Sequence, residues 1–216
     1  MAASLPPALD KPRQRGRPKL RPDDAQRSLI ADCARQLFLQ KGYGRTTTDE
    51  VAARCRISKH TLYRLFPGKP ALFAAIVDLH RQAMLALPGD YDGLPLDRAL
   101  EAIFRIDIDP QADKDRVALL RLVMLEAHQS PELGEIVRRH GADKSRTELA
   151  GWLAAQASRG AIAIDDPHSA ARILMDMIFG AIAFKTVDNL NWPGDDDRNA
   201  HIRRCIAVFL NGVRPR

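Results

Sequence analysis

Cysteine is scarce in this chain of 216 residues, and the chain has no long uninterrupted apolar run. Its three cysteines, Cys33, Cys55 and Cys205, are scattered and form no CxxC pair, so we interpret them as small buried side chains in a reducing cytoplasm. The longest apolar stretch, residues 173–184, contains an aspartate and a glycine and is shorter than the roughly 20 residues that a membrane span needs. The N-terminus lacks the basic flank followed by an apolar run that is typical of secretory signals. We therefore expect a cytoplasmic protein with no membrane partner.

Sequence motifs of the common enzyme classes are also missing. The chain contains no GxSxG, GxxxxGK[ST], HExxH or GxGxxG pattern. Its acidic clusters, Asp107/Asp109, Asp165/Asp166 and Asp195–Asp197, lie at expected helix starts or in loops, where capping and solvation explain them. We predict that the protein is not an enzyme and that it needs no cofactor or metal.

Positive charge is concentrated in the first third of the chain. The total is +6, and the composition, with 45% hydrophobic and 28% charged residues, is that of a globular protein. Residues 1–70 hold 15 basic and 6 acidic side chains, a net +9, whereas residues 71–216 hold 18 and 21, a net −3. This division predicts a basic module that binds a polyanion, with nucleic acid the first candidate and an anionic membrane surface the second.

Residues 1–22 are expected to form a disordered basic arm, because they combine five prolines with a run of basic residues. Within the arm, Arg15 and Arg17 flank Gly16 in a slim Arg-Gly-Arg-Pro core. Such a core fits a narrow A·T-rich minor groove and locally resembles an AT-hook peptide. The alternative is a tail that binds DNA without sequence preference by releasing counterions.

From residue 23 onward the apolar residues recur with helical spacing, and no alternating stretch is long enough to predict a strand. The sequence therefore predicts an all-α fold of about nine helices. A longer helix and two short helices are expected in residues 23–69, and a fourth, connecting helix within residues 70–88 is expected to run from Pro70 through Leu87. The other helices are predicted at residues 95–107, 112–129, 131–159, 167–189 and 196–211, in a C-terminal domain of residues 89–216.

Local signals in residues 23–69 define a helix-turn-helix unit. Thr47 and Glu50 have the spacing of a capping box, and Ser58 is a good N-cap for a short helix after a tight turn. Leu62 and Phe66, four residues apart, are predicted to face inward. The outer face of this third helix then holds Lys59, His60, Tyr63 and Arg64. These donors suit base edges and phosphates in a major groove, and a plain solvated helix face is the alternative.

Lys69 lies at the start of the fourth helix, where a cation opposes the helix dipole. Backbone amides at a helix start form a phosphate site together with an ammonium group, so we predict that a DNA phosphate offsets this cost. The amides capped by Thr47 are candidates for a phosphate by the same logic. For Lys69 the alternative is an ordinary surface lysine.

Two adjacent segments, GYGRTTTDEVAA at residues 42–53 and ISKHTLYRLFPGKPALF at residues 57–73, resemble the TetR family of bacterial transcriptional regulators. The resemblance implies a homodimer whose N-terminal helices bind a palindromic operator and whose variable C-terminal domain binds a small effector. It also implies DNA contacts at Thr47, Lys59, His60, Tyr63 and Lys69. One departure is Arg56, which stands where the family usually has glycine in a left-handed turn, costs about 1 kcal/mol there, and can add a phosphate contact. The full set of predicted DNA-binding residues is Arg15, Arg17, Arg45, Thr47, Thr48, Arg56, Ser58, Lys59, His60, Thr61, Tyr63, Arg64 and Lys69.

The helix expected at residues 167–189 is apolar almost all round, which predicts that every face of it is buried. We infer a dimer interface in which this helix and the last helix pair with those of a second chain, resembling the family's four-helix arrangement. Its predicted residues are Ile178, Ile182, Ile202, Ile206 and Phe209. A central core helix within one chain is the alternative.

Large or adaptable apolar side chains on several C-terminal helices are the candidates for an effector pocket. The predicted ligand-binding residues are Phe104, Leu120, Met124, His128, Trp152, Met175 and Phe179. Their alternative role is in the hydrophobic core. For the polar candidates His128, Asp176 and Gln156 the alternative is a surface position or an internal hydrogen bond.

Together these features predict a repressor that a small hydrophobic effector releases from a palindromic operator in double-stranded DNA. The two recognition helices of a dimer must lie about 34 Å apart, or a multiple of that distance, and a tilt of the fourth helix would change the separation. The alternatives are an activator or dual regulator, which uses the same contacts, and an architectural or membrane-surface protein that uses the basic arm and has no effector.

Overall fold

The computed structural model describes residues 23–183 and 198–215, apart from the side chains of residues 181–183. The predicted arm at residues 1–22, with Arg15 and Arg17, and the side chain of Ile182 lie outside the described residues. So do the parts of two expected helices at residues 184–189 and 196–197. Within the described ranges no residue is in a β-strand.

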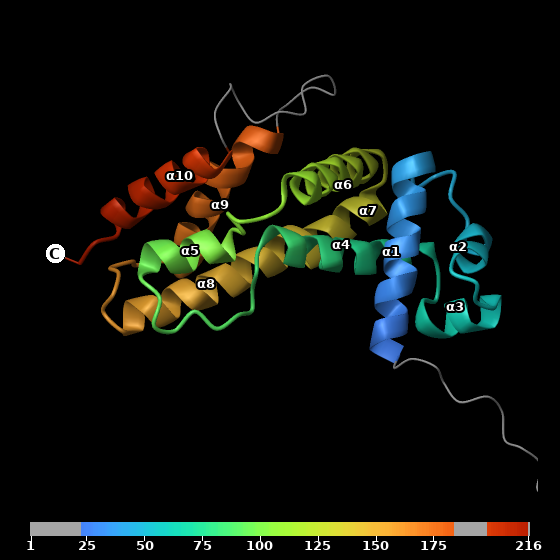
Figure 1. Cartoon of the computed structure of the whole chain (residues 1–216), viewed down its shortest axis with the longest axis horizontal. Helices are drawn as coiled ribbons and strands as arrows, with labels where there is room; N and C mark the ends of the chain where they lie inside the picture. Colours follow the sequence, from blue (N-terminus) through green and yellow to red (C-terminus); the bar gives the residue numbers. More distant parts are fainter. Residues whose placement is uncertain (1–22, 184–197, 216) are drawn as a thin grey trace, which may run out of the picture.

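Ten α-helices and one π-helical segment make up the described part of the chain. They are α1 (Asp23–Lys41), α2 (Thr48–Arg54), α3 (Lys59–Leu65), α4 (Lys69–Met84), α5 (Leu96–Ile103), α6 (Pro110–Gln129), α7 (Pro131–Ile136), η1 (Val137–Ala142), α8 (Asp143–Ser158), α9 (Pro167–Ala183) and α10 (Arg198–Gly212). Because α7, η1 and α8 follow one another without a break, residues 131–158 form one continuous rod (Figure 1). The predicted all-α fold is confirmed, and counting this rod once gives nine helices in the described ranges. None of the described helices combines the length and the apolar character that crossing a membrane requires.

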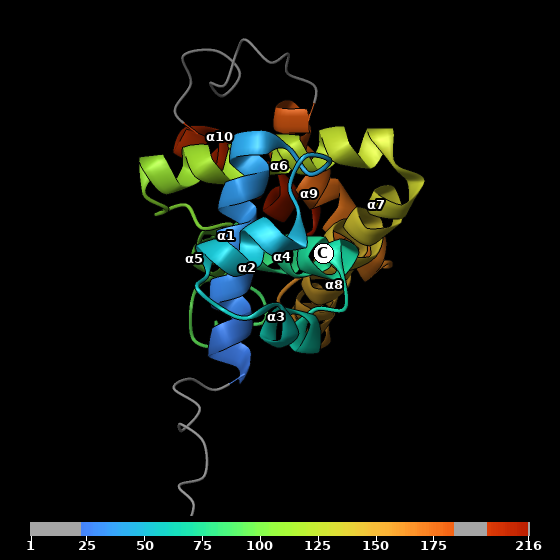
Figure 2. The ribbon, with the colours of Figure 1, turned by 90° about the vertical axis from the view of Figure 1, so that its right-hand side faces the viewer.

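The helices form an elongated molecule in which α1, α2 and α3 make up one end and α5, α9 and α10 the other (Figure 1). The helices α4, α6 and α7 lie between the two ends. Figure 2 looks onto the end formed by α1, α2 and α3, with the remaining helices behind it. The N-terminal unit and the C-terminal helices therefore meet along α4 and α6.

Two hydrophobic cores occupy the two ends. The first core combines side chains of α1 to α4, such as Phe38, Leu62 and Phe73, with Leu119 and Val123 of α6. The second core is built from α5, α8, α9 and α10, and its fully buried members include Leu100, Phe104, Leu149, Leu174 and Ile178. Helix α6 thus packs onto the N-terminal unit although it belongs to the C-terminal part of the sequence.

The prediction that the fourth helix runs through Leu87 is wrong, because α4 ends at Met84. Leu85 has extended dihedrals (φ −128°, ψ 126°), and the amide of Ala86 donates to the carbonyl of Ile103 over 2.8 Å. Leu85 and Leu87 are buried in the second core. Apolar spacing alone therefore marked Leu87 as buried, but this segment reaches the core as extended chain and not as helix.

The capping signals of the helix-turn-helix unit are confirmed. Thr47 and Glu50 form both bonds of the capping box, and the Ser58 side chain accepts from the amide of Thr61. Arg56 in the turn between α2 and α3 has a φ of 54°, so this residue adopts the left-handed conformation that glycine adopts more easily. The turn has the expected geometry without glycine.

A buried arginine joins the start of α10 to the segment between α5 and α6. The Arg198 guanidinium donates to the carbonyls of Phe104, Arg105 and Ile106 over 3.1 to 3.3 Å. Its Nε lies 3.3 Å from a carboxylate oxygen of Asp113 at the start of α6. One planar cation therefore satisfies several backbone acceptors and a carboxylate in the interior.

We expect Arg198→Met to lower the free energy of unfolding by about 3 kcal/mol, because the substitution removes a charged donor from three carbonyls and one of the two arginines that pair with Asp113. Urea unfolding followed by circular dichroism measures the loss. Arg98→Met is the matched control, because Arg98 pairs with Glu101 at the surface and such pairs contribute about 0.5 kcal/mol. Equal effects of the two substitutions would contradict the role of Arg198.

Candidate nucleic-acid interface and ligand cavity

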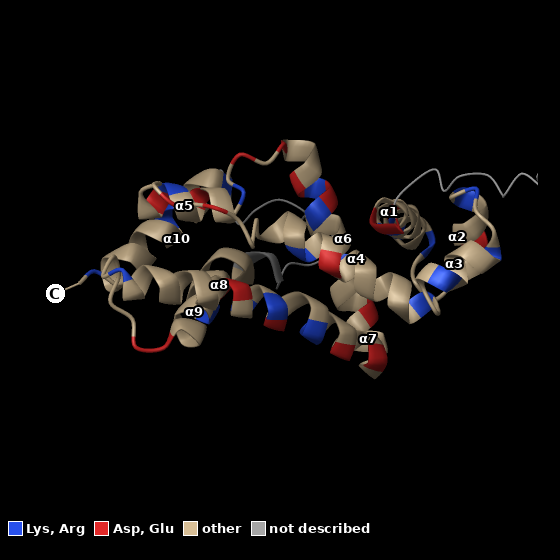
Figure 3. Cartoon of the chain, turned by 90° about the horizontal axis from the view of Figure 1, so that it is seen from below, with Lys and Arg blue, Asp and Glu red and all other residues tan. Residues whose placement is uncertain are grey.

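The outer face of α3 is the candidate DNA-binding surface. Leu62, Leu65 and Phe66 are buried in the first core and fix the orientation of this short helix. The side chains that it exposes are Lys59, His60, Tyr63 and Arg64. Figure 3 shows lysine and arginine along α3, at the end of the molecule opposite the C-terminus. The structure therefore brings the four predicted contact residues of this helix to one accessible face.

Side chains from α1 and α2 hold three of these residues. The Lys59 ammonium lies 2.6 Å from a carboxylate oxygen of Asp49, which raises the pKa of the lysine through a hydrogen bond. The hydroxyls of Tyr63 and Thr48 are 2.9 Å apart. Arg64 binds both carboxylate oxygens of Asp23 over 3.0 and 3.2 Å. These exposed pairs are weak, so a phosphate can replace the carboxylates.

The backbone amides at the start of α2 are partly occupied within the chain. The amide of Thr47 donates to Glu50 over 3.0 Å, and the amide of Glu50 donates to the Thr47 hydroxyl over 3.2 Å. Hydrogen bonds from Lys41 and then from the Thr47 amide lower the pKa of Glu50. The amides of Thr47 and Glu50 are therefore not available to a phosphate, because the capping box already uses them. The prediction of a phosphate at the amides capped by Thr47 is corrected for these two groups.

The prediction that a DNA phosphate offsets the charge of Lys69 at the start of α4 also needs correction. Its ammonium donates to the carbonyls of Tyr43, Gly44 and Thr46 over 2.8, 3.3 and 3.1 Å, and it lies 4.2 Å from the centroid of the Tyr43 ring. These partners offset the unfavourable position at the start of α4 without a phosphate. Lys69 therefore fastens the loop between α1 and α2 to α4, and we expect this internal role in place of the DNA contact.

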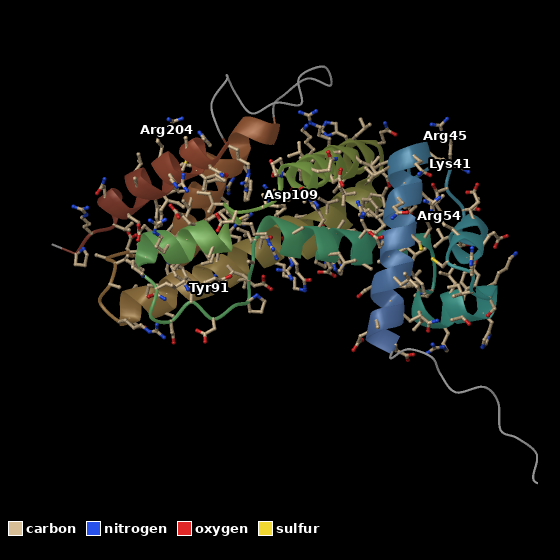
Figure 4. All side chains as sticks on the ribbon, viewed as in Figure 1. Lys41, Arg45, Arg54, Tyr91, Asp109 and Arg204 are labelled. Atoms are coloured by element: carbon tan, nitrogen blue, oxygen red, sulfur yellow. The ribbon has the colours of Figure 1, made fainter. Side chains whose placement is uncertain are left out.

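The remaining predicted positions lie in the loops and caps of the helix-turn-helix unit. Arg45 is exposed and donates through Nε to the carbonyl of Lys41 over 2.8 Å, and Arg56 is exposed at the turn. Ser58 and Thr61 bind one another through hydroxyls 2.9 Å apart, as part of the cap of α3. Two further basic side chains that were not among the predicted contacts, Lys41 and Arg54, lie at the same end of the molecule as Arg45 (Figure 4). Lys41 pairs with Glu50, and Arg54 donates to Gln36.

A cavity of about 250 Å³ lies among α4, α6, α9 and the η1–α8 part of the rod. Its wall is mainly apolar and includes Met84, Leu120, Met124, Met175 and Phe179. The polar residues of the wall are His80, Arg81, Arg121 and Ser145. Small-molecule sites also combine an apolar wall with a few polar groups. Their volumes begin at about 300 Å³, slightly above the volume of this cavity. The cavity is therefore suited to a small ligand.

The structure brings four of the seven predicted ligand-binding residues to this cavity, namely Leu120, Met124, Met175 and Phe179. Phe104 is fully buried behind the wall, in contact with Phe179 at a ring-centroid distance of 5.7 Å. Trp152 packs against the second core, and His128 is exposed on α6. The predictions for Phe104, Trp152 and His128 need correction, because side-chain type indicates burial but does not identify the space that a residue faces.

The predicted dimer residues also need correction. Ile178, Ile202, Ile206 and Phe209 are at most 5% exposed, since α9 and α10 pack them into the second core of their own chain. The outer face of the same helices instead exposes Ile173 and Val208, by 53% and 62%. Nor is α9 buried on every face. The two predicted helices therefore carry an exposed apolar surface, but it consists of other residues.

The cavity and the first core share part of their packing. Val77 of α4 and Val123 of α6 belong to the first core and also line the cavity. A Cβ atom added to Gly141 of η1 would lie 3.3 Å from the Val77 side chain, so the π turn packs directly on this valine. One helical turn beyond the cavity, Glu126 of α6 accepts from the amide of Tyr43 over 2.9 Å. Two routes, one apolar and one polar, thus connect the cavity wall to the helix-turn-helix unit.

Comparison with known proteins identifies both parts of the chain. Residues 30–76 match the family described as bacterial regulatory proteins of the tetR family, and residues 98–212 match the C-terminal domain of AefR-like transcriptional repressors. The chain belongs to the TetR family of bacterial transcriptional regulators. Members of this family, and the relatives found, are transcriptional regulators and not enzymes, which confirms the expectation from the missing motifs.

Relatives of this TetR-family regulator extend over most of the chain. The uncharacterized HTH-type transcriptional regulator Rv1556 of Mycobacterium tuberculosis is 30% identical over 181 residues, covering 81% of this chain and 83% of the relative. The regulator UidR of Escherichia coli is 26% identical, covering 87% and 92%. Among solved structures, the flavonoid-responsive regulator FrrA is 26% identical, with a TM-score of 0.63 over 89% of this chain and 99% of that protein. Salmonella enterica GusR, at 23% identity and a TM-score of 0.65 over 89% and 99%, shares the fold.

We expect Lys69→Met to lower the free energy of unfolding by about 2 kcal/mol, because three carbonyls lose a charged donor, and to leave the salt dependence of DNA binding unchanged. Lys59→Ala is expected to do the opposite. It should change stability by about 0.5 kcal/mol or less and reduce the salt slope by about one per subunit. Urea unfolding and DNA binding titrated at several salt concentrations give the two readouts. A reduced slope with unchanged stability for Lys69→Met would restore its phosphate role.

Proposed function

We propose that this TetR-family regulator is a repressor that binds a palindromic operator as a homodimer and leaves it when a small apolar effector fills the cavity. Since bacterial DNA lies in the cytoplasm, the protein acts there. The match of the C-terminal part to a repressor domain favours repression over activation. The observation that carries the proposal is the sharing of Val77 and Val123 between the cavity wall and the first core.

On the DNA side, α3 enters the major groove of each half-site. Lys59 and Arg64 exchange their carboxylate partners for phosphates, and His60 and Tyr63 meet base edges or the backbone. Arg56 adds a phosphate contact from the turn. The basic arm with Arg15 and Arg17 supplies further contacts, in the minor groove or through counterion release.

The homodimer forms through the outer face of α9 and α10. Ile173 and Val208 expose more than half of their surface on these adjacent helices, and both line a shallow groove together with Met177. Large exposed apolar side chains that cluster on one face mark interaction surfaces. To bind a palindromic operator, the dimer must hold its two α3 helices on one side and about 34 Å apart, which is the spacing of successive major grooves.

Val208→Asp is expected to convert the dimer into a monomer at micromolar concentration, because it buries an unpaired charge in the interface. Sedimentation equilibrium measures the change. Leu94→Asp is the control, since Leu94 is also half exposed but lies in the loop before α5. A Val208→Asp protein that remains dimeric would contradict this interface.

An effector in the cavity acts on DNA binding through α4 and α6. A ligand that presses on Val77 and Val123 also acts on the helix-turn-helix unit, because both side chains belong to the first core and protein interiors are close-packed. A movement of α6 also displaces Glu126 from the Tyr43 amide. A difference of 1 to 3 kcal/mol between the DNA-competent and effector-bound states weakens operator binding by about 5-fold to 150-fold. The name of FrrA, a flavonoid-responsive regulator, supports control by a small molecule.

Glu126→Ala is expected to reduce the effector-induced loss of operator affinity several-fold, because it removes the polar link between α6 and the loop after α1. Footprinting of the DNA upstream of the regulator's own gene, with and without a panel of small apolar compounds, measures operator affinity and release. Glu135→Ala, which removes an exposed carboxylate paired with Arg138, is the control. Unchanged release by the Glu126→Ala protein would exclude this link, and a protein that protects no DNA would exclude the repressor itself.

A further inference from the structure

The cavity wall contains a buried histidine whose ring has no hydrogen-bond partner within residues 23–183 and 198–215. His80 is 7% exposed, and neither Nδ1 nor Nε2 has a partner in the described part of the chain. Buried side-chain nitrogens almost always have one. His80 also lines the cavity, so a molecule in the cavity is the natural source of the missing bond.

The next residue, Arg81, also has one buried nitrogen without a hydrogen bond in the described residues. Its side chain is 2% exposed and binds Glu148 of α8 through Nη1. Its Nε has no hydrogen bond in the described residues, although it forms a long ion pair of 4.0 Å with a carboxylate oxygen of Asp78. The same wall thus offers an imidazole N–H and a guanidinium N–H whose acceptors are missing.

The electrostatic environment favours an anionic acceptor. Burial first, and then the positive charges of Arg116 and Arg35, lower the pKa of His80 to about 4. The ring is therefore neutral at pH 7 and has one donor nitrogen. Asp113 and Asp32 pair with these two arginines. A neutral hydroxyl would also satisfy the imidazole, but it would gain less than a carboxylate from the nearby positive charges.

The rest of the cavity wall is mainly apolar, so the part of the ligand that faces it must also be apolar. Met84, Leu120, Met124, Met175 and Phe179 surround the space, and its volume of about 250 Å³ lies just below the usual range of about 300 to 1,000 Å³. Methionine side chains adapt to irregular shapes, so a small ring or a short chain can be accommodated.

We propose that the effector is a small apolar carboxylic acid, bound as its carboxylate with the head group at His80 and Arg81 and the apolar part against the methionines and Phe179. This assignment rests on the proposed function in taking the cavity ligand as the effector. The specific claim is that the histidine N–H and the arginine Nε–H bind the carboxylate.

Isothermal titration calorimetry of the full-length protein without DNA tests this claim with three probes of one shape, namely 3-phenylpropanoate, 3-phenylpropanamide and 3-phenylpropan-1-ol. We expect the carboxylate to bind at least about tenfold more tightly than the amide and the alcohol, because charge-assisted hydrogen bonds are the stronger ones. His80→Phe, which keeps a ring but removes both nitrogens, should cost the carboxylate about tenfold or more. His80→Gln, which keeps an N–H donor, should retain most of the affinity. His128→Phe is the control for a histidine outside the cavity.

Equal or tighter binding of the alcohol or the amide, no binding of the carboxylate, or carboxylate affinity that His80→Phe leaves unchanged would overturn the proposal. Circular dichroism verifies that each variant is folded, and the His80 ring resonance of the wild-type protein gives a second readout. Its pKa should rise when the carboxylate binds and stay constant with the alcohol. Release of operator DNA is measured separately. A carboxylate that binds through His80 without releasing DNA would contradict the repressor mechanism and leave the ligand class intact.

Discussion

The packing of α4 against α6 is the contact on which both ends of the protein depend. Val77 and Val123 fill the interface from the two helices, and each side chain has the helix-turn-helix core on one side and the cavity on the other. Close-packed interiors leave little free volume, so neither valine can move for a ligand without disturbing the core that orients α3. The helix-turn-helix end and the cavity are therefore parts of one packing arrangement.

Features that depend on neighbours in the sequence could be predicted well. The capping box of Thr47 and Glu50, the Ser58 cap and the left-handed turn at Arg56 involve atoms within three residues of one another. The outer face of α3 followed from Leu62 and Phe66, because one buried stripe fixes the exposed one on a short helix. The family resemblance extended over the same segment.

Features that depend on distant partners could not be predicted. Lys69 binds carbonyls that lie 23 to 26 positions earlier, and Arg198 binds carbonyls more than 90 positions earlier. Periodicity indicated that Ile202 and Ile206 are buried, but it gives no information on whether the covering surface belongs to the same chain or to a second one. His80 was missed for the same reason, since a histidine in an amphipathic helix carries no sign of the cavity beside it.

The π turn between α7 and α8 adds a geometric consequence for the long rod. Leu133 before this turn packs in the first core, whereas Leu149 and Leu153 after it pack in the second. A π turn holds one residue more than an α-helical turn, and each added residue rotates everything that follows by about 100°. The rod can therefore present its apolar side to two cores in different directions while its backbone stays helical. A change in the winding at residues 137–142 would turn the two cores relative to each other about a single axis, without unfolding any helix.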